Sequence, residues 1–483
     1  MEWKTLLTEE KLHFEEKEPE QFAQYPINEF EKDYNKIVSS SVFRRLQDKT
    51  QVFPLEKSDF IRTRLTHSIE VSTIARQLGI MISKNETQYR PADIDSEVAE
   101  SIASVLLCAG LLHDLGNPPF GHFGETTIGD WFRENLDTIF YKGKPLRQCL
   151  NQQMICDLEN FEGNAQALRI LMKARHGSEI NLSQSIISTL VKYPTDSCSF
   201  DGKDPDIRKH KPGFYFAEQE PFQQLVKKVG TVDADGNVCR HPLTFVLEAA
   251  DDIAYATADL EDAFRKKLFT LDQFIDFFQQ GYAEEKAGGY RNPEHYSDVL
   301  IKDLIHRREG SRANDEKDAR VFQKWLNYTR RWLMYVAVFR FTNKDSYAAI
   351  MSGTYRTDLF HDTYHSCTVE ILKKAMKEFV FDTKGILKPE LSAQSILSFL
   401  LKGFVKAALY YDGEDASAGF VPSKADKKYI SLLSKNDRQD YQDTKTGDEQ
   451  MDLYLRLLMV TDYISGMTDT YARTLYRELS GIE

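Results

Sequence analysis

The chain has 483 residues, of which 41% are hydrophobic and 12% aromatic, and its formal net charge at pH 7 is -12. Such an acidic chain is a poor candidate for a protein that coats nucleic acid, although composition leaves room for a local basic groove. No run approaches the roughly 20 apolar residues of a membrane helix. The polar N-terminal segment over residues 1–40 lacks the basic and apolar blocks of a signal peptide. We therefore expect a soluble, cytoplasmic protein without a membrane partner.

Helical patterns dominate the first half of the chain. Apolar residues recur at helical spacing over 31–48 and 65–83. The clearest helix runs from Asp95, which suits the N-cap position, to His113. Gly116 and the two prolines that follow it then end the helical pattern.

The stretch 194–242 is rich in Gly, Pro and Asp, and we expect a long excursion there. Within it, residues 231–238 predict a small β-hairpin with its turn at Asp235 and Gly236. Pro242 then suits the first turn of the next helix.

The second half of the chain alternates between polar and helical stretches. The polar stretches 284–320 and 412–450 predict connections or mobile excursions, and the segments 322–341, 393–411 and 451–479 predict helices. The predicted fold is mainly α-helical, with a C-terminal helical half packed on the N-terminal half and a small hairpin excursion.

The six cysteines lie far apart in the chain, and none forms a CxxC pair, which argues against a zinc knuckle. We expect buried or free thiols, as in a reducing compartment. Their positions are 108, 149, 156, 198, 239 and 367.

A histidine–aspartate pair, His113 and Asp114, ends the clearest predicted helix. By itself such a pair is most simply a solvated helix end. A metal site becomes the favoured interpretation because two further groups of ligand type are present. His67 starts an upstream helical run, and the pair Asp251 and Asp252 follows downstream. Imidazole and carboxylate ligands suit a borderline or hard divalent ion, and four such groups would leave positions open for water and substrate.

His122 and Glu125 follow within the same segment. If a helix restarts near Phe120, they share a face within one turn. A carboxylate beside a histidine favours the imidazolium, which can protonate a departing oxygen near neutral pH. The alternative is a structural His–Glu contact.

The whole ordered pattern resembles the HD superfamily of metal-dependent phosphohydrolases, and within it the bacterial dGTP triphosphohydrolases. The resemblance is carried by six blocks in order: FRRLQDKTQVFPLE (43–56), TRLTHS (63–68), HDLGNPPFGHFGE (113–125), FEGNAQ (161–166), EAADDIAYATADLEDA (248–263) and DYISGMTDTYA (462–472). It implies an HD-domain core over 41–275, after the polar segment, and a C-terminal helical region over 276–483 that completes the substrate pocket.

The resemblance implies a metal-ligand set made of His67, His113, Asp114 and Asp251, holding Mg²⁺ or Mn²⁺, with Asp252 as the competing choice for the last ligand. It also implies hydrolysis of dGTP at the α-phosphorus. A bound divalent ion would lower the pKa of its water, and the hydroxide would attack the phosphorus. The products would be the deoxynucleoside and inorganic tripolyphosphate.

The same resemblance assigns His122 as the acid that protonates the 5′-oxygen, with Glu125 holding it. Direct attack on phosphorus by His122 is a minor alternative. Arg64, Lys192 and Lys211 are the candidates for binding phosphates, with Arg44 as a further one. For any single cation a solvated surface position is an equal alternative. No Walker loop occurs in the chain.

Sugar and base contacts are assigned by the resemblance to Gln51, Asn164, Tyr255 and Asp259. Tyr255 would pack under the deoxyribose and disfavour a 2′-hydroxyl, and Gln51 would bond the 3′-hydroxyl. Asp251, Tyr255 and Asp259 lie four residues apart, which places them along one face of a regular helix.

Two other functions stay open, namely an HD phosphodiesterase of another nucleotide and a nucleotide-sensing or DNA-binding regulator. The family precedent favours guanine as the base and a homo-oligomer, with a hexamer as one form, and it leaves single-stranded DNA open as a regulator. The pair His361 and His365 lacks a third ligand, and we interpret it as structural or exposed. The role of His176 stays open.

Overall fold

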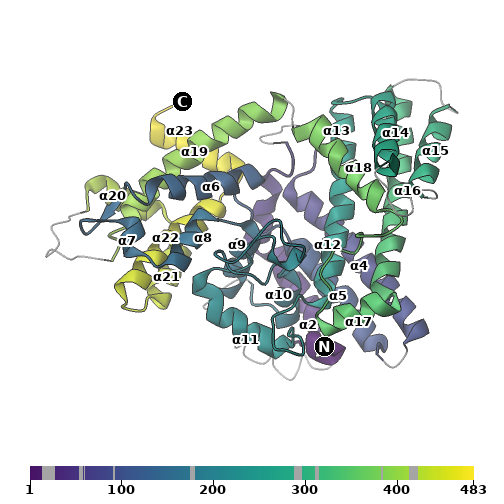
Figure 1. The fold of residues 1–483 in the computed structure, drawn as a ribbon. Helices are drawn as coiled ribbons and strands as arrows, with labels where there is room; N and C mark the ends of the chain where they lie inside the picture. Colours follow the sequence, from purple (N-terminus) through teal and green to yellow (C-terminus); the bar gives the residue numbers. More distant parts are fainter. Residues whose placement is uncertain are drawn as a thin grey trace.

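The computed structural model describes residues 1–13, 28–53, 58, 60–90, 93–173, 180–287, 296–309, 315–381, 384–412 and 422–482. These residues are mainly helical, as predicted (Figure 1). None of the described helices has the length and apolar character needed to cross a bilayer.

The helix expected over 31–48 is divided into three short pieces. Helix α2 covers Glu29–Ser39, α3 covers Ser41–Arg44, and a 3₁₀ turn, η2, covers Arg45–Asp48. The break lies at Ser40, whose backbone is extended and whose hydroxyl accepts a hydrogen bond from the Phe43 amide. Because Ser40 caps the next helix, the helix is interrupted there although the apolar pattern continues.

Helices α4 (Arg64–Tyr89) and α5 (Ser96–Leu112) form the centre of the N-terminal half. The predicted N-cap is confirmed, because Asp95 accepts a hydrogen bond of 2.9 Å from the Val98 amide. The two helices pack closely at Gly110, where an added Cβ would lie 2.3 Å from the Cα of Ser72. This close packing fixes the end of α5, and with it the His113–Asp114 pair, against α4.

Helix α12 (Pro242–Ala254) begins with proline at its first turn, as predicted, but it does not continue as a regular α-helix. A π-helical turn, η5, covers Tyr255–Asp259 before α13 resumes over Leu260–Arg265. The expectation of one regular helical face through residue 259 is therefore wrong. Arg62, which precedes helix α4, stabilises the π-helical turn, because its Nη1 donates a hydrogen bond of 3.2 Å to the Ala258 carbonyl.

The excursion over 194–242 is more ordered than its composition indicates, since it contains helix α11 (Gln219–Val229). The predicted turn is present, with the Asp233 amide donating to the Asn237 carbonyl at 2.9 Å and a single bridge between Val232 and Val238. The two-stranded antiparallel sheet lies elsewhere, where β1 (Phe140–Tyr141) pairs with β2 (Lys144–Pro145).

The polar stretches expected to be connections hold helices in their described parts, so that expectation is wrong. The helices in question are α15 (Tyr296–Glu309), the start of α16 (Asp315–Thr342), α20 (Lys424–Leu432) and α21 (Lys435–Thr444). Capping explains the last two, because serine side chains accept amide hydrogen bonds at both N-termini.

The three helices predicted for the second half are present with different bounds: they correspond to α16, α19 (Lys384–Ala408), and the pair α22 (Glu449–Ser465) and α23 (Asp469–Ser480). The remaining helices are α1 (Trp3–Leu6), α6 (Gly121–Asn135), α7 (Leu146–Cys149), α8 (Gln152–Glu159), α9 (Gly163–Met172), α10 (Gln184–Leu190), α14 (Leu271–Ala287), α17 (Lys344–Ser352) and α18 (Ser366–Met376). Short turns are η3 (Ile207–Lys209), η4 (Phe216–Glu218) and the π-helical η6 (Lys377–Phe381).

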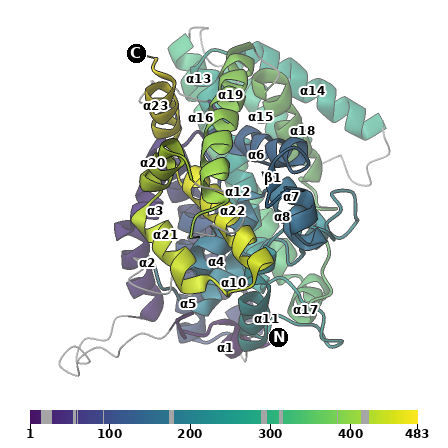
Figure 2. The same cartoon turned by 90° about the vertical axis from the view of Figure 1, so that its left-hand side faces the viewer.

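The C-terminal half packs on the N-terminal half in two groups. Helices α19 to α23 pack against α6 and α8 around one apolar cluster, whereas α14, α15, α16 and α18 surround another beside η5 (Figures 1 and 2). A third cluster is centred on α4, α5, α10 and α12. The candidate site residues come from the elements where these clusters meet. The proposed domain bounds stay a prediction.

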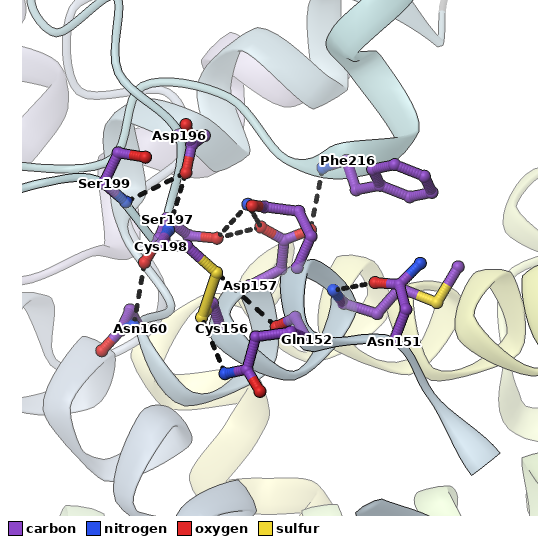
Figure 3. The surroundings of a disulfide bond; sticks show 12 residues. Asn151, Gln152, Cys156, Asp157, Asn160, Asp196, Ser197, Cys198, Ser199 and Phe216 are labelled. Atoms are coloured by element: carbon purple, nitrogen blue, oxygen red, sulfur yellow. Dashed lines mark hydrogen bonds between the residues drawn. A yellow bond between two sulfur atoms is a disulfide. The ribbon is translucent and has the colours of Figure 1, made fainter. Parts of the chain in front are cut away.

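The expectation of free thiols is wrong for one pair, because Cys156 on α8 and Cys198 in the following excursion form a disulfide with a Cα–Cα distance of 5.4 Å (Figure 3). Hydrogen bonds align the two segments, since Asn160 donates to the Ser197 carbonyl at 3.1 Å and the Ser197 hydroxyl donates to Asp157. The cysteines are separated by 42 residues, so a search for local pairs does not find them. The other four cysteines form no disulfide among the described residues.

Candidate active site

Two histidines and an aspartate from three helices meet at the centre of the N-terminal half. His67 lies on α4, His113 caps the C-terminal end of α5, and Asp251 lies on α12. One potential ligand atom from each of the three side chains lies within 4.8 Å of the other two. The Oδ1 atom of Asp251 is 3.3 Å from Nε2 of His67 and 3.4 Å from Nε2 of His113.

The hydrogen bonds of this group leave atoms suited to bind a cation. The Nδ1 atom of His113 lies 2.9 Å from the Gly110 carbonyl, which assigns the ring proton to Nδ1. Its Nε2 atom is buried and has no hydrogen-bond partner among the described residues. A histidine fixed in this way by its second nitrogen is typical of metal ligands. The donor set therefore fits a divalent metal ion.

Asp114 adjoins the group but is also paired with other residues. Its Oδ2 atom lies 3.5 Å from Nε2 of His113 and 2.7 Å from Nη1 of Arg64. Its Oδ1 atom accepts a hydrogen bond of 2.7 Å from the side-chain Nδ2 of Asn117. Burial alone would raise the pKa of Asp114, but the guanidinium of Arg64 holds it well below its usual range. A carboxylate that stays ionised is a competent metal ligand.

Asp252 faces a different partner. Its Oδ2 atom accepts from Lys373 of α18 at 3.3 Å, and burial raises its pKa to about 6. Burial acts in the same direction on Asp251, yet the charge of Lys192 holds the pKa of Asp251 well below its usual range. The geometry therefore favours Asp251 over Asp252 as the carboxylate nearest to both histidines.

His122 and Glu125 form the contact that their spacing predicts. Helix α6 begins at Gly121, and Nδ1 of His122 lies 2.7 Å from Oε2 of Glu125. The His122 side chain is 76% exposed, whereas that of Glu125 is 8% exposed and also accepts from the Gly163 amide. The hydrogen bond and charge of Glu125 raise the pKa of His122. An accessible imidazolium on a buried carboxylate can deliver a proton to a bound molecule.

Three of the four predicted phosphate-binding cations are paired with a carboxylate near the site. Lys192 donates to Oδ2 of Asp251 at 2.7 Å, and Lys211 donates to Oε1 of Glu162 at 3.1 Å. Arg64 pairs with Asp114, as described above. Arg44 is different, because it is exposed and its guanidinium donates to the Ser39 carbonyl. The structure therefore brings three of the four predicted cations to the site.

The predicted sugar and base residues also lie around this centre. Burial raises the pKa of Asp259 to about 7, with the nearby His67 and the Gln51 amide opposing the shift. Tyr255 is half-buried at the start of the π-helical turn that ends at Asp259. Asn164 lines a small cavity together with His113 and Lys192, and donates to Glu162.

An open groove runs beside His122 and is bordered by helix α6, the end of α8 and the segment 161–162. It encloses about 390 Å³, and its lining includes Glu125, Lys211 and Arg133. A larger hollow of about 940 Å³ lies between α2, α4 and α5 and contains none of the predicted site residues. Among the predicted site residues, the smaller groove is thus lined by His122, Glu125 and Lys211, whereas His113, Asn164 and Lys192 line the small cavity described above.

The sequence interpretation missed Asn117, Glu162 and Lys49, although each lies in a quoted block. Lys49 is buried and donates to the carbonyls of Asn117 at 2.6 Å and Ser465 at 2.7 Å. Burial lowers its pKa to about 7. The contacts of Lys49 join segments that are far apart in the sequence, so these contacts can be identified only from the folded structure.

The pair His361 and His365 is not part of this group. His361 is exposed, and His365 is buried with Nδ1 at 3.2 Å from the Thr368 hydroxyl, which agrees with the structural interpretation. His176 lies outside the described residues.

The family model described as HD domain matches residues 64–179. The chain is 40% identical over 459 residues to the deoxyguanosinetriphosphate triphosphohydrolase-like protein of Listeria monocytogenes, with 94% of each chain covered. The protein of the same name from Listeria innocua gives the same identity and coverage. The deoxyguanosinetriphosphate triphosphohydrolase of Yersinia enterocolitica is 32% identical over 500 residues, again with 94% of each chain covered. The HD match contains His67, His113 and His122, whereas Asp251 lies beyond it.

Proposed function

The chain belongs to the deoxyguanosinetriphosphate triphosphohydrolase family of HD-domain proteins, and we propose that it hydrolyses dGTP to deoxyguanosine and inorganic tripolyphosphate. The observation that carries the proposal is the convergence of His67, His113 and Asp251 within 4.8 Å. The accessible His122, paired with the buried Glu125, lies on the helix that follows the His113–Asp114 segment.

The proposed metal-binding residues are His67, His113, Asp114 and Asp251, and the proposed ion is Mg²⁺ or Mn²⁺. A divalent ion held there would supply Lewis-acid polarisation of phosphoryl oxygens and activation of water. The chain's own contribution is to keep both carboxylates ionised, which Arg64 and Lys192 favour through their charges.

The proposed role of Arg64, Lys192 and Lys211 is to bind the triphosphate. Each is held near the site by a carboxylate, so each is already placed where an anionic substrate would arrive. Hydrogen bonds from cations to phosphate oxygens are strong and offset the negative charge of the transition state. An acidic protein of net charge -12 needs such a local positive set to bind a nucleotide.

His122 is proposed to protonate the 5′-oxygen of deoxyguanosine as its bond to the α-phosphorus breaks. Glu125 would favour the protonated ring and fix its orientation through the 2.7 Å contact at Nδ1, which leaves Nε2 to face the substrate. Such general acid catalysis near neutral pH agrees with the raised pKa of His122.

Tyr255, Gln51, Asp259 and Asn164 are proposed to bind the nucleoside. The ring of Tyr255 would pack against the deoxyribose and leave no room for a 2′-hydroxyl. Guanine is the proposed base, from the names of the relatives. A homo-oligomer, and regulation by single-stranded DNA, stay predictions.

Chromatographic product analysis with each of the four dNTPs and GTP, in Mg²⁺ or Mn²⁺, tests this proposal. We expect deoxyguanosine and tripolyphosphate from dGTP and little turnover of GTP. Equal rates on all four dNTPs would reject the guanine preference alone. Comparable kcat/KM for GTP and dGTP would reject the role of Tyr255. Cleavage of a nucleotide phosphodiester without action on dGTP would replace the proposal with an HD phosphodiesterase.

A further inference from the structure

Asp469, near the C-terminal end of the chain, makes contacts that a helix-start residue does not need. It is the first residue of α23 and is 2% exposed. The neighbouring Thr468 already caps this helix, accepting from the Tyr471 amide. Both carboxylate oxygens of Asp469 instead bind other segments: Oδ1 accepts from the Phe120 amide at 2.9 Å, and Oδ2 accepts from the Thr50 amide at 3.1 Å and from its hydroxyl.

The Phe120 amide belongs to a turn that requires support. Phe120 has a φ of 66° and Gly121 a φ of 62°, so two consecutive residues adopt the left-handed conformation. A bulky residue holds this conformation only where its surroundings impose it. The turn also starts α6, and Phe120 offers no side-chain cap to that helix. The Asp469 carboxylate is thus a hydrogen-bond acceptor fixed at the residue that sets the direction of α6.

The position of His122 depends on this turn, because His122 is the second residue of α6. A second contact holds the preceding part of the segment: Lys49 joins the carbonyls of Asn117 and Ser465 at 2.6 and 2.7 Å. Asn117 in turn donates to Asp114. The C-terminal residues 465–469 therefore hold the segment 114–122 at two points, one beside a proposed metal ligand and one beside the proposed acid.

We propose that Asp469 is a positioning residue for the reaction: it fixes the left-handed turn at Phe120 and so sets His122 at a constant place relative to the metal-ligand group. This role rests on the proposed function of His122 as the acid. It assigns a task in the chemistry to a residue from the C-terminal half, more than 340 positions away in the sequence.

The variant Asp469→Asn tests this role with little change of shape. Its amide has one acceptor oxygen, so an N–H of Phe120 or Thr50 would face an NH₂ group instead of an acceptor. The matched control is Asp426→Asn on α20, where a carboxylate that is 6% exposed accepts from the Ser423 amide at 2.9 Å. Asp426 lies outside the candidate site, so it reports the general cost of removing a buried carboxylate.

Two measurements on the full-length protein decide the outcome. Hydrogen–deuterium exchange of the peptide containing Phe120 should become faster in Asp469→Asn and stay at the wild-type rate in Asp426→Asn. With dGTP and Mn²⁺, kcat of Asp469→Asn should fall by about 10²-fold, as expected for a displaced catalytic group. KM and bound Mn²⁺ should change by less than about threefold, because binding and metal retention do not depend on His122.

If the exchange rate of the peptide containing Phe120 is unchanged in Asp469→Asn, then Asp469 does not hold the turn. Faster exchange with wild-type kcat, or a loss of kcat no greater than that of Asp426→Asn, would overturn the positioning role. Loss of Mn²⁺ together with kcat would make Asp469 a support of the metal group instead. If the wild type itself releases no tripolyphosphate, the proposed function fails by that result alone, and the exchange measurement still decides whether Asp469 holds the turn.

Discussion

The Nζ atom of Lys192 lies 2.7 Å from Oδ2 of Asp251, the carboxylate whose other oxygen faces both histidines. A residue proposed to bind phosphate thus contacts a residue proposed to bind metal. The contact keeps Asp251 ionised and holds Lys192 at the group, so the two proposed binding tasks are linked through one ion pair.

Replacement of Lys192 by methionine should weaken nucleotide binding more than metal binding. We predict that KM for dGTP rises by about 10-fold or more, since a hydrogen bond to a charged group contributes about 1.5–3 kcal/mol. Mn²⁺ should still bind, because the substitution frees Oδ2 of Asp251. Lys209→Met is the control, as Lys209 lies in the excursion that follows Lys192, is 50% exposed and pairs with Asp204. An equal KM in the two variants would contradict the role of Lys192.

His113→Ala and Asp114→Ala should each abolish turnover and lower the bound metal, because each removes one of only four proposed ligands. Metal content measured by mass spectrometry after dialysis against Mn²⁺ checks this prediction. The exposed His361→Ala variant should keep both metal and activity. Full metal occupancy in His113→Ala and Asp114→Ala would exclude the proposed ligand set.

His122→Ala should lower kcat while metal and nucleotide remain bound. General acid catalysis contributes roughly 10²–10⁴-fold, so the loss should fall within that range. If the variant lost its metal, His122 would be a ligand; if it kept a near-normal kcat, another group would have to be the acid.

The pH dependence of kcat gives the same pair a second test. The acid acts in its protonated form, so the rate should fall as pH rises through the pKa of His122, which Glu125 raises above its ordinary value. Glu125→Gln removes the charge that favours the imidazolium, so it should move this alkaline limb to lower pH. If the alkaline limb lies at the same pH in the wild type and in Glu125→Gln, then the limb reflects the titration of a group other than His122.

The Cys156–Cys198 disulfide should be measurable by thiol titration of the unfolded, non-reduced protein, which should show four free thiols. Closing a loop of 42 residues stabilises a fold by about 2–4 kcal/mol. Cys198→Ser should therefore lower the free energy of unfolding in urea by that amount, whereas Cys149→Ser, at a free cysteine, should not. Six titrated thiols would show that the bond does not form in solution.

Local chemistry explains which features could be predicted from the sequence. The cap at Asp95, the helix start at Pro242 and the contact between His122 and Glu125 involve residues within three positions of each other, so spacing alone indicates them. The order of the histidines and aspartates indicated the metal group, and the fold brings His67, His113 and Asp251 together.

The features that were missed depend on partners far away in the chain. The π-helical turn before Asp259 is held in part by Arg62, whose guanidinium reaches it from nearly 200 positions upstream. The disulfide and the contacts of Lys49 and Asp469 likewise join distant segments. The polar helices α20 and α21 were missed for another reason, since capping defines their starts and apolar periodicity does not.

The most direct test of the central claim is the identification of both products of dGTP hydrolysis in isotopically labelled water with Mn²⁺. The account predicts equal amounts of deoxyguanosine and tripolyphosphate, with the labelled oxygen in tripolyphosphate alone, because the bond between the α-phosphorus and the 5′-oxygen is the one that breaks. Release of orthophosphate or pyrophosphate, or label in the 5′-hydroxyl of deoxyguanosine, would contradict it.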